Sequence, residues 1–176
     1  CRDPLKKTIE LLLSGYVVAI KGLGGFHLAV DAANDDAVRR LRSRKFREEK
    51  PLAIMVRDLE TAISISRIGK EEEQILLSPQ RPIVLARKRG AAIISPAVAP
   101  GVSDFGIMLP YTPLHHMLLE KDFDALVMTS ANQVDEPICI ENREALKRLD
   151  GIADYFLMHN RDILVRCDDS IATVSS

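Results

Sequence analysis

Three observations predict an α/β domain. Along the 176 residues, short apolar segments typical of buried strands alternate with segments whose apolar residues recur every three to four positions, as in helices. Hydrophobic residues make up 47% of the chain and charged residues 28%, which is typical of a globular protein with a core. No internal repeat or low-complexity linker divides the sequence. A single α/β domain over residues 1–176 is therefore the simplest prediction.

The N-terminal half supplies helices and strands in turn. Asp3 followed by Pro4 predicts the start of a helix that ends at Gly15. Asn34 or Asp35 caps a second helix, which is expected to run to about residue 45. The other elements expected here are strands at 16–22, 27–32 and 52–57, and a short helix after Asp58.

The C-terminal half continues the alternation. Apolar runs at 82–87 and 125–132 predict buried strands, and the segment 107–119 has the pattern of a strand end, a turn and a helix. A helix over 141–149 ends near Gly151. The remaining expected elements are a helix around 71–77 and short strands around 155–158 and 171–174.

Composition excludes several classes of protein. No apolar run reaches the roughly 18 residues of a membrane helix, and no signal peptide precedes the first helix. The three cysteines, at positions 1, 139 and 167, do not have the spacing of a zinc ribbon or a disulfide framework, which favours a reducing cytoplasm. Because the chain starts at Cys1 without Met, it is expected to be a piece of a longer protein.

Positive charge is concentrated between residues 39 and 50. This segment carries seven Lys or Arg and two Glu, a net charge of +5, while the rest of the chain carries −6. Such polarity predicts a local anionic ligand rather than a general coat of nucleic acid. Arg39, Arg40 and Arg42 are expected to be ordinary surface charges.

The spacing of Lys45 and Arg47 carries information. Residues two apart on a helix point about 200° away from each other, whereas in an extended segment they share a face. Pro51 disfavours helical geometry at Lys50, and the glutamates at 48–49 would oppose the dipole of a helix C-terminus. The helix is therefore expected to end near Lys45, so that Lys45, Arg47 and Lys50 can converge on an anion. A solvated basic helix end is the alternative.

Ser130 and Asn132 follow a predicted buried strand. Open α/β sheets place ligand contacts at such strand ends. A hydroxyl, an amide and free backbone N–H groups there suit the oxygens of a phosphate or a ribose. Taken alone, the S-x-N pattern fits an Asx or Ser turn equally well.

Three further segments leave alternatives open. The glycine-rich loop KGLGGFH (21–27) follows a strand, and its glycines allow either close approach of a ligand or a tight β-turn. Asp168, Asp169 and Ser170 fit either a Mg²⁺ site beside a nucleotide or a turn. The adjacent histidines at 115–116 lack zinc-ligand spacing and are expected to pack or cap.

Together these segments resemble a known family. Lys45-x-Arg47, with Lys50 downstream, and Ser130-x-Asn132 match the K-x-R and S-x-N signature of YrdC/Sua5-type domains. Over essentially the whole chain, the sequence is similar to the YrdC-like domain of the HypF family of hydrogenase-maturation carbamoyltransferases. The segments that carry this similarity are KGLGGFHLAVDAANDDAV, KPLAIMVRDLE, RPIVLARK, GIMLPYTPLHHMLL, LVMTSAN, EPI, GIADYFLMHNRDI and CDDS.

The resemblance implies a fold and a reaction. The fold would be the YrdC/RibB-like twisted mixed sheet flanked by helices, with a basic cleft. The reaction would join ATP to carbamate derived from carbamoyl phosphate, giving carbamoyl-adenylate. In full-length HypF, other domains pass the carbamoyl group to the C-terminal cysteine of HypE, and it becomes a cyanide ligand of nickel–iron hydrogenase. An excised single domain is expected to carry only part of that reaction.

The signature residues receive roles from the same resemblance. Lys45 and Arg47 are expected to clamp the phosphates or the carbamoyl oxygen, with Lys50 in support. Ser130 and Asn132 would hold the α-phosphate and the ribose side of the adenylate. The four signature residues would line the cleft that binds ATP.

Five other residues are weaker candidates under the same resemblance. Lys21 and His27 would border the carbamoyl pocket. Arg166 and Ser170 would lie near the phosphates, and Asp169 would ligate Mg²⁺.

Two alternative functions remain at this stage. Threonylcarbamoyl-adenylate synthases share the signature but carry an aromatic-Pro-Thr-Glu motif where this chain has residues 21–24, and usually Arg and His where it has Met108 and Thr112. Those departures weaken a role in tRNA modification. A non-catalytic module that binds double-stranded RNA is the other alternative, and the compact basic segment argues against it.

Overall fold

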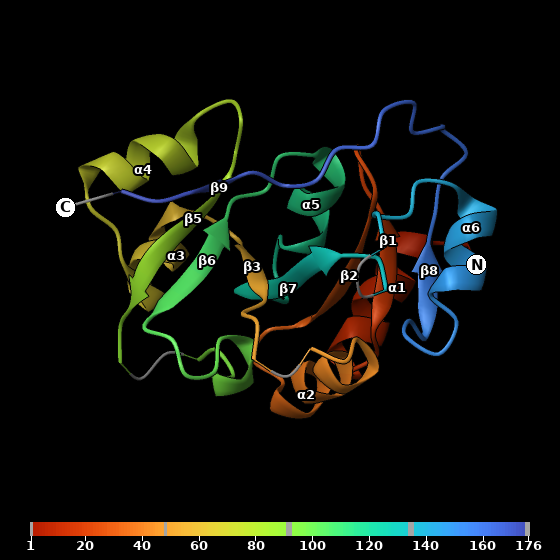
Figure 1. Cartoon of the computed structure of the whole chain (residues 1–176), viewed down its shortest axis with the longest axis horizontal. Coiled ribbons are helices and arrows are strands. Elements are labelled where there is room, and N and C mark those ends of the chain that lie inside the picture. Colours follow the sequence, from red (N-terminus) through yellow and green to blue (C-terminus); the bar gives the residue numbers. More distant parts are fainter. Residues whose placement is uncertain (1, 48, 91–92, 134–135, 175–176) are drawn as a thin grey trace.

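A mixed sheet of nine strands runs through the described part of the chain and carries helices on both faces (Figure 1). The structure is a computed structural model in which residues 2–47, 49–90, 93–133 and 136–174 are described. Cys1 and Glu48, which entered the expectations above, lie outside these ranges. Helices and strands alternate as predicted, so the α/β class is confirmed.

The strands form one continuous sheet. They are β1 (Val18–Lys21), β2 (Phe26–Asp31), β3 (Ala53–Val56), β4 (Ser66–Arg67), β5 (Ile83–Lys88), β6 (Asp104–Met108), β7 (Ala125–Ser130), β8 (Tyr155–Leu157) and β9 (Ile171–Ala172). Their order is β4-β5-β6-β3-β7-β2-β1-β8, with β9 beside β5. The pairs β1–β8, β3–β6 and β5–β9 are parallel and the others antiparallel.

The helices begin at or close to the residues that the sequence predicts. They are α1 (Pro4–Leu13), α2 (Asp35–Arg44), α3 (Leu59–Ile65), α4 (Lys70–Leu77), α5 (Pro113–Leu118) and α6 (Asn142–Arg148), with a 3₁₀ turn η1 (Pro96–Val98). The side chains of Asp3, Asn34 and Asp58 each accept a first-turn backbone N–H, at 3.0, 3.0 and 2.8 Å. No described helix is both long and apolar enough to cross a membrane.

Alternation along the strands divides the core into two layers. Phe26, Leu28 and Val30 of β2 are buried in the layer that also contains buried residues of α2, α3, α4 and α6. Val18 and Ile20 of β1 belong to the opposite layer, with buried residues of α1 and α5. Because successive side chains of a strand point to opposite faces, a shift of register by one residue would exchange these layers. Burial of each large apolar side chain contributes about 1.5–3 kcal/mol, so the register is strongly fixed.

Helix α2 ends at the position that the site requires. Lys45 is the C-cap, and the next residue, Phe46, has the left-handed φ of 48°. The N–H of Phe46 bonds to the carbonyl of Ser43 at 3.1 Å, and that of Arg47 to the carbonyl of Arg42 at 3.0 Å. This is the Schellman pattern, in which the left-handed residue is usually glycine. The helical course is broken between Lys45 and Arg47, as the sequence predicts.

The left-handed conformation of Phe46 gives a test of this helix end. Phe46 is 85% exposed, so its ring contributes little packing to offset the cost of that backbone conformation. Phe46→Asn should raise the free energy of unfolding by about 0.5–1 kcal/mol, because asparagine tolerates the left-handed region. Urea unfolding measures the change. Phe46→Ala, which removes the ring but keeps the strain, is the control, and equal stability of the two variants would contradict this explanation.

Candidate functional site

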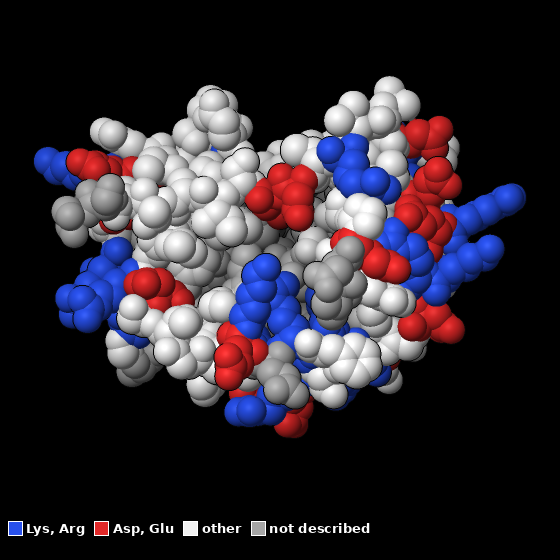
Figure 2. All heavy atoms as spheres, viewed as in Figure 1, with Lys and Arg blue, Asp and Glu red and all other residues white. Residues whose placement is uncertain are grey.

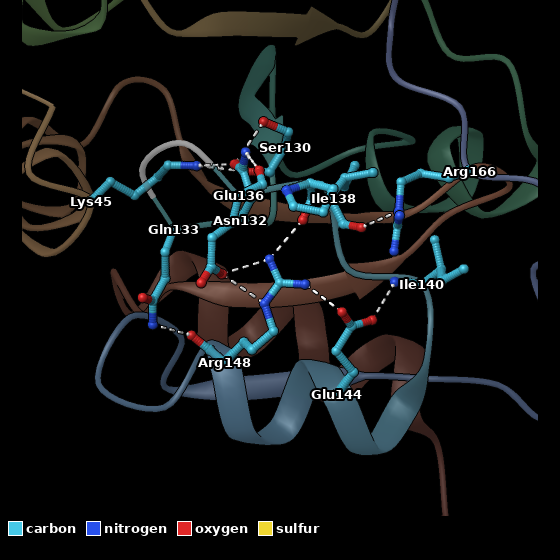
Figure 3. Close-up of polar contacts among 11 residues, drawn as sticks. Lys45, Ser130, Asn132, Gln133, Glu136, Ile138, Ile140, Glu144, Arg148 and Arg166 are labelled. Atoms are coloured by element: carbon cyan, nitrogen blue, oxygen red, sulfur yellow. Dashed lines mark hydrogen bonds and ion pairs between the residues drawn. The ribbon is translucent and has the colours of Figure 1, made fainter.

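The K-x-R and S-x-N segments meet at the end of β7 (Figure 3). Lys45 Nζ donates to the backbone carbonyl of Ser130 at 2.6 Å and to Asn132 Oδ1 at 3.1 Å. Asn132 Oδ1 also accepts from Ser130 Oγ at 3.0 Å. Burial, and secondarily the charge of Arg47, lowers the pKa of Lys45 to about 8. The ammonium group therefore joins two segments that lie 85 residues apart in the chain.

Arg47 contacts the same strand end. Its guanidinium donates to Thr129 Oγ1 at 3.1 Å and to the carbonyl of Pro51 at 2.8 Å. Within the described residues, the buried Nε of Arg47 has no hydrogen-bond partner. That atom is closed off from solvent, but the guanidinium has five N–H donors and lines the cavity, so donors of Nη1 and Nη2 remain for a bound anion. Lys50 is exposed beside the same cavity.

A cavity of about 370 Å³ opens next to these residues. Its floor consists of strand residues from β3, β5, β6 and β7, while Arg47 and Lys50 supply positive charge and Asp168 and Asp169 supply negative charge. Figure 2 shows positive and negative side chains facing each other across a hollow in the middle of this face. The described lining is therefore of mixed charge, and the basic cleft that the resemblance implies is not seen. The volume lies within the usual range for small-molecule sites.

The glycine-rich segment is the turn of the β1–β2 hairpin. Gly22 N–H bonds to the carbonyl of Gly25 at 2.8 Å, which closes a tight turn. The register of β2 against β7 places His27 opposite Ser130. Of the two alternatives for this segment, the structure therefore has the β-turn, and the turn lies directly beside the S-x-N segment.

Lys21 and His27 occupy different environments. Lys21 is buried, and its Nζ donates to the carbonyl of His159 at 3.3 Å. His27 Nε2 lies 3.1 Å from Asp169 Oδ2. Neither residue lines the described cavity wall, but His27 holds Asp169, which does. The geometry thus connects His27 to the site and leaves Lys21 with a structural contact.

Asp169 is the centre of a buried polar cluster that the sequence did not predict. Tyr111 Oη donates to Asp169 Oδ1 at 3.3 Å, and its ring lies edge-on against His115 with 4.5 Å between centroids. Burial, and secondarily the charge of His27, lowers the pKa of His115 to about 4, so its imidazole is neutral near pH 7. Burial is the largest single effect and would raise the pKa of Asp169, but the hydrogen bonds from His27 and Tyr111 and the charges of the neighbouring histidines together outweigh it and lower the pKa. The Asp169 carboxylate is therefore ionised at neutral pH and binds both His27 and Tyr111.

The C-terminal tail crosses the molecule from β8 to β5 and passes the cavity (Figure 1). Cys167 N–H bonds to the carbonyl of Gly24 at 3.0 Å, and the carbonyl of Ser170 accepts from Ile83 N–H at 2.8 Å. Arg166 Nε donates to the carbonyl of Ile138 at 2.9 Å. Arg166 and Ser170 are exposed, and neither is among the cavity-lining residues, so the structure does not bring them to the phosphate position expected for them.

The carboxylates of the tail are compatible with Mg²⁺ bound alongside phosphates. Mg²⁺ beside nucleotides usually takes one or two carboxylates together with substrate phosphates and waters. Asp168 and Asp169 both line the cavity, and both oxygens of Asp169 already accept from His27 and Tyr111. Asp168 is exposed and is the freer of the two carboxylates. Among the described residues, no group of three or more His, Cys, Asp or Glu forms a metal cage of its own.

The expectation for the upstream arginines is partly wrong. Arg39 is exposed and pairs with Asp35 on its own helix, as expected of a surface charge. Arg42, in contrast, is only 8% exposed and donates to the carbonyl of Lys50 at 3.3 Å. Arg42 faces inward because the Schellman turn folds the basic segment back against the helix end. Its bond to the Lys50 carbonyl therefore helps to hold the residues that follow Lys45 and Arg47 against the helix end.

Comparison with known proteins assigns the chain. The family model for Sua5/YciO/YrdC proteins, described as "Telomere recombination", matches residues 10–176. The chain belongs to the Sua5/YciO/YrdC family. It is 52% identical to the carbamoyltransferase HypF2 of Cupriavidus necator over 184 residues, covering 96% of this chain and 23% of that protein. The carbamoyltransferase HypF of Rhizobium leguminosarum bv. viciae is 47% identical, over 97% of this chain and 23% of the relative.

Solved structures agree with this assignment. Full-length HypF in a phosphate- and nucleotide-bound form superposes with a TM-score of 0.94 at 48% identity, covering 97% of this chain and 27% of that one. The Sua5 of P. abyssi complexed with L-threonine has a TM-score of 0.84 at 16% identity, over 97% of this chain and 50% of that one, and so shares the fold. The predicted resemblance and the twisted mixed sheet are confirmed. The chain spans about a quarter of the length of these HypF proteins.

The contact between the glycine hairpin and the tail can be tested at Gly24. A Cβ added there would lie 2.4 Å from the backbone carbonyl oxygen of Cys167, so either the hairpin or the tail has to move. Gly24→Ala should release the tail and accelerate tryptic cleavage after Arg161 and Arg166 at least several-fold. Gly90→Ala is the matched control, because a Cβ at that position meets nothing within 4 Å. Equal cleavage rates in the two variants would show that the tail does not depend on this contact.

The lowered pKa of Lys45 predicts a pH-dependent stability. The unfolded chain holds the Lys45 proton up to about pH 10.4, whereas the folded protein releases it near pH 8. Because the unfolded state then binds more protons, stability should rise with pH between these values, by at most about 1.4 kcal/mol per pH unit. The difference in unfolding free energy between the wild type and Lys45→Met, measured in urea at pH 7.5 and 9.5, isolates this contribution. A difference that stays constant with pH would mean that Lys45 titrates normally.

Proposed function

We propose that this domain joins carbamate to the α-phosphorus of ATP, forming carbamoyl-adenylate and releasing pyrophosphate. The carbamate derives from carbamoyl phosphate. The carbamoyl group then passes, through the other parts of a full-length HypF protein in the cytoplasm, to the C-terminal cysteine of HypE. Relatives of the same family that match almost the whole chain are named carbamoyltransferases, and one of their structures is described as nucleotide-bound. These names support the proposal.

One observation assigns the proposed reaction to particular residues. The K-x-R and S-x-N segments, far apart in sequence, meet beside a cavity on which Arg47 and Lys50 place positive charge. A polyphosphate needs cations more than it needs a side-chain nucleophile, because the reaction gathers negative charge around the α-phosphorus. The cavity suits this chemistry.

The reaction follows from the roles of these groups. An oxygen of carbamate attacks the α-phosphorus, the bond from that phosphorus to the bridging oxygen breaks, and the electron pair leaves with pyrophosphate. Arg47 holds the phosphates through the Nη donors that Thr129 and Pro51 do not use, and Lys50 stabilises the leaving pyrophosphate. Lys45 is buried and is not among the residues that line this cavity, and its Nζ donates to Ser130 and Asn132, so its role is to fix these two residues beside the phosphates. Ser130 and Asn132 hold the adenylate on the ribose side.

The cavity carboxylates have a separate role. Asp168 and Asp169 would hold Mg²⁺, with Asp168 the principal ligand because Asp169 is already bonded to His27 and Tyr111. When bound, Mg²⁺ neutralises phosphate charge and orients the leaving group. His27 keeps Asp169, and with it the tail, in place beside the phosphates.

Two positions favour carbamate over a threonine-derived substrate. Met108, the last residue of β6, is fully buried in the core layer that also contains residues of α1 and α5. Thr112 is committed to capping α5, where its Oγ1 accepts the N–H of His115 at 3.1 Å. Neither residue can replace the Arg and His that usually contact the amino acid in threonylcarbamoyl-adenylate synthases.

Exchange of labelled pyrophosphate into ATP, dependent on added ammonium carbamate, tests the proposed reaction and its cation. Arg47→Met should lower the exchange rate by about 10²-fold or more, because a charge-assisted phosphate contact is lost. Arg39→Met removes an equal charge from the same basic segment and should change the rate less than twofold, because Arg39 only pairs with Asp35 at the surface.

Three outcomes would contradict the assignment. Exchange within twofold of the wild type in Arg47→Met would remove Arg47 from the site. Exchange that requires L-threonine and bicarbonate instead of carbamate would indicate threonylcarbamoyl-adenylate synthesis. Double-stranded RNA binding that falls steeply with salt and does not compete with ATP would indicate the RNA-binding alternative.

A further inference from the structure

Arg148, at the end of α6, contacts residues 133, 136 and 137, which follow Asn132 and are called the post-Asn132 segment below (Figure 3). Its Nε and Nη2 donate to Glu136 Oε2 at 2.8 and 2.7 Å, and Nη2 also donates to the carbonyl of Pro137 at 2.7 Å. Its own carbonyl accepts from Gln133 Nε2 at 2.9 Å. Nη1 is fixed by a short ion pair with Glu144 on the same helix. One side chain and its backbone thus bind the three residues of the post-Asn132 segment.

The contacts continue from Arg148 to the site. The backbone carbonyl of Glu136 accepts from Asn132 Nδ2 at 2.7 Å. On its other side, Asn132 Oδ1 accepts from Lys45 Nζ and Ser130 Oγ. The carbonyl on one side and the ammonium on the other permit only one orientation of the Asn132 amide. The position of the Glu136 backbone therefore determines where the Asn132 side chain lies and how its amide group is oriented.

The number of simultaneous contacts distinguishes this arrangement from an ordinary surface ion pair. The side chain of Arg148 is 20% exposed and that of Glu136 43% exposed, but Arg148 binds a carboxylate and a carbonyl of neighbouring residues at once. The residue directly after the post-Asn132 segment packs closely on the glycine hairpin, because a Cβ added at Gly25 would lie 2.5 Å from Ile138 Cδ1. A shift of the post-Asn132 segment would therefore disturb both the hairpin and Asn132.

We propose that Arg148 is a positioning residue of the adenylate site, which acts on the nucleotide through Glu136 and Asn132 and touches no substrate itself. This inference rests on the proposed function for its kinetic consequence. Without the guanidinium, the Glu136 backbone is free to move, so Asn132 and the Lys45 ammonium lose their fixed geometry. Because preorganised donors stabilise the transition state without reorganising, a loosened Asn132 lowers the rate while the fold persists.

A double-mutant cycle with Asn132 separates positioning from general stability. Arg148→Met keeps the aliphatic stem and removes every side-chain donor, and should lower carbamate-dependent pyrophosphate exchange about tenfold. In the Asn132→Ala background, the same change should cost less than twofold, because its effect passes through Asn132. Lys147→Met removes an exposed cation from the same helix and should leave exchange unchanged. An equal loss in both backgrounds, or no loss at all, would overturn the inference.

A second measurement does not depend on the reaction. Cys139 N–H bonds to the carbonyl of Ala131 at 3.0 Å and so closes the loop that contains the post-Asn132 segment. Its amide hydrogen should exchange at least fivefold faster in Arg148→Met than in Lys147→Met, and unchanged exchange would refute the clamp.

Failure of the proposed function would be recognised in the wild type. If wild-type protein gives no carbamate-dependent pyrophosphate exchange, the proposed function fails, and the same cycle is then measured as ATP affinity by calorimetry. Non-additive losses of ATP affinity would still support Arg148 as a positioning residue. Absence of ATP binding by the wild type would overturn both proposals.

Discussion

A buried ammonium group links the parts of this molecule on which its chemistry depends. Lys45 is removed from water, so its charge has to be compensated by protein acceptors. The carbonyl of Ser130 and the amide oxygen of Asn132 supply them. These two bonds hold the end of α2 against the end of β7, and removal of either acceptor would leave a buried charge without its partner, which is strongly destabilising. The junction of Lys45 with Ser130 and Asn132 is therefore part of the folded core.

The sheet places further groups around this junction. Pairing of β2 with β7 sets His27 against Ser130, and His27 in turn holds Asp169 of the tail. The tail brings two carboxylates to the cavity opposite Arg47 and Lys50. Opposite charges on two walls compensate each other when no anion is bound, and a polyphosphate with a divalent cation can be inserted between them without leaving a large net charge. Mixed charge is thus as suitable for a nucleotide as a uniformly basic cleft.

The fold was predictable because its signals are local. Capping side chains, glycine stops and apolar periodicity all pointed to elements that the structure contains, which is the agreement between levels expected of a natural sequence. The short strand β4 and the turn η1 were missed, since two or three residues show no periodicity. The inward position of Arg42 was also missed, because charge content alone cannot show which arginines face the protein.

The sequence alone determined that the helix ends near Lys45, that a polar pair follows a buried strand, and which family the chain resembles. Only the tertiary structure decided that Tyr111 and His27 bind Asp169, that His115 packs against Tyr111, and that Arg148 holds Glu136 beyond Asn132. In sequence, Glu144 and Arg148 are indistinguishable from an ordinary surface pair one helical turn apart. The physical reason is that the ends of helices and strands are determined by short-range sterics and hydrogen bonds. The contacts of Asp169 and Arg148, in contrast, form only after the sheet has brought distant segments together.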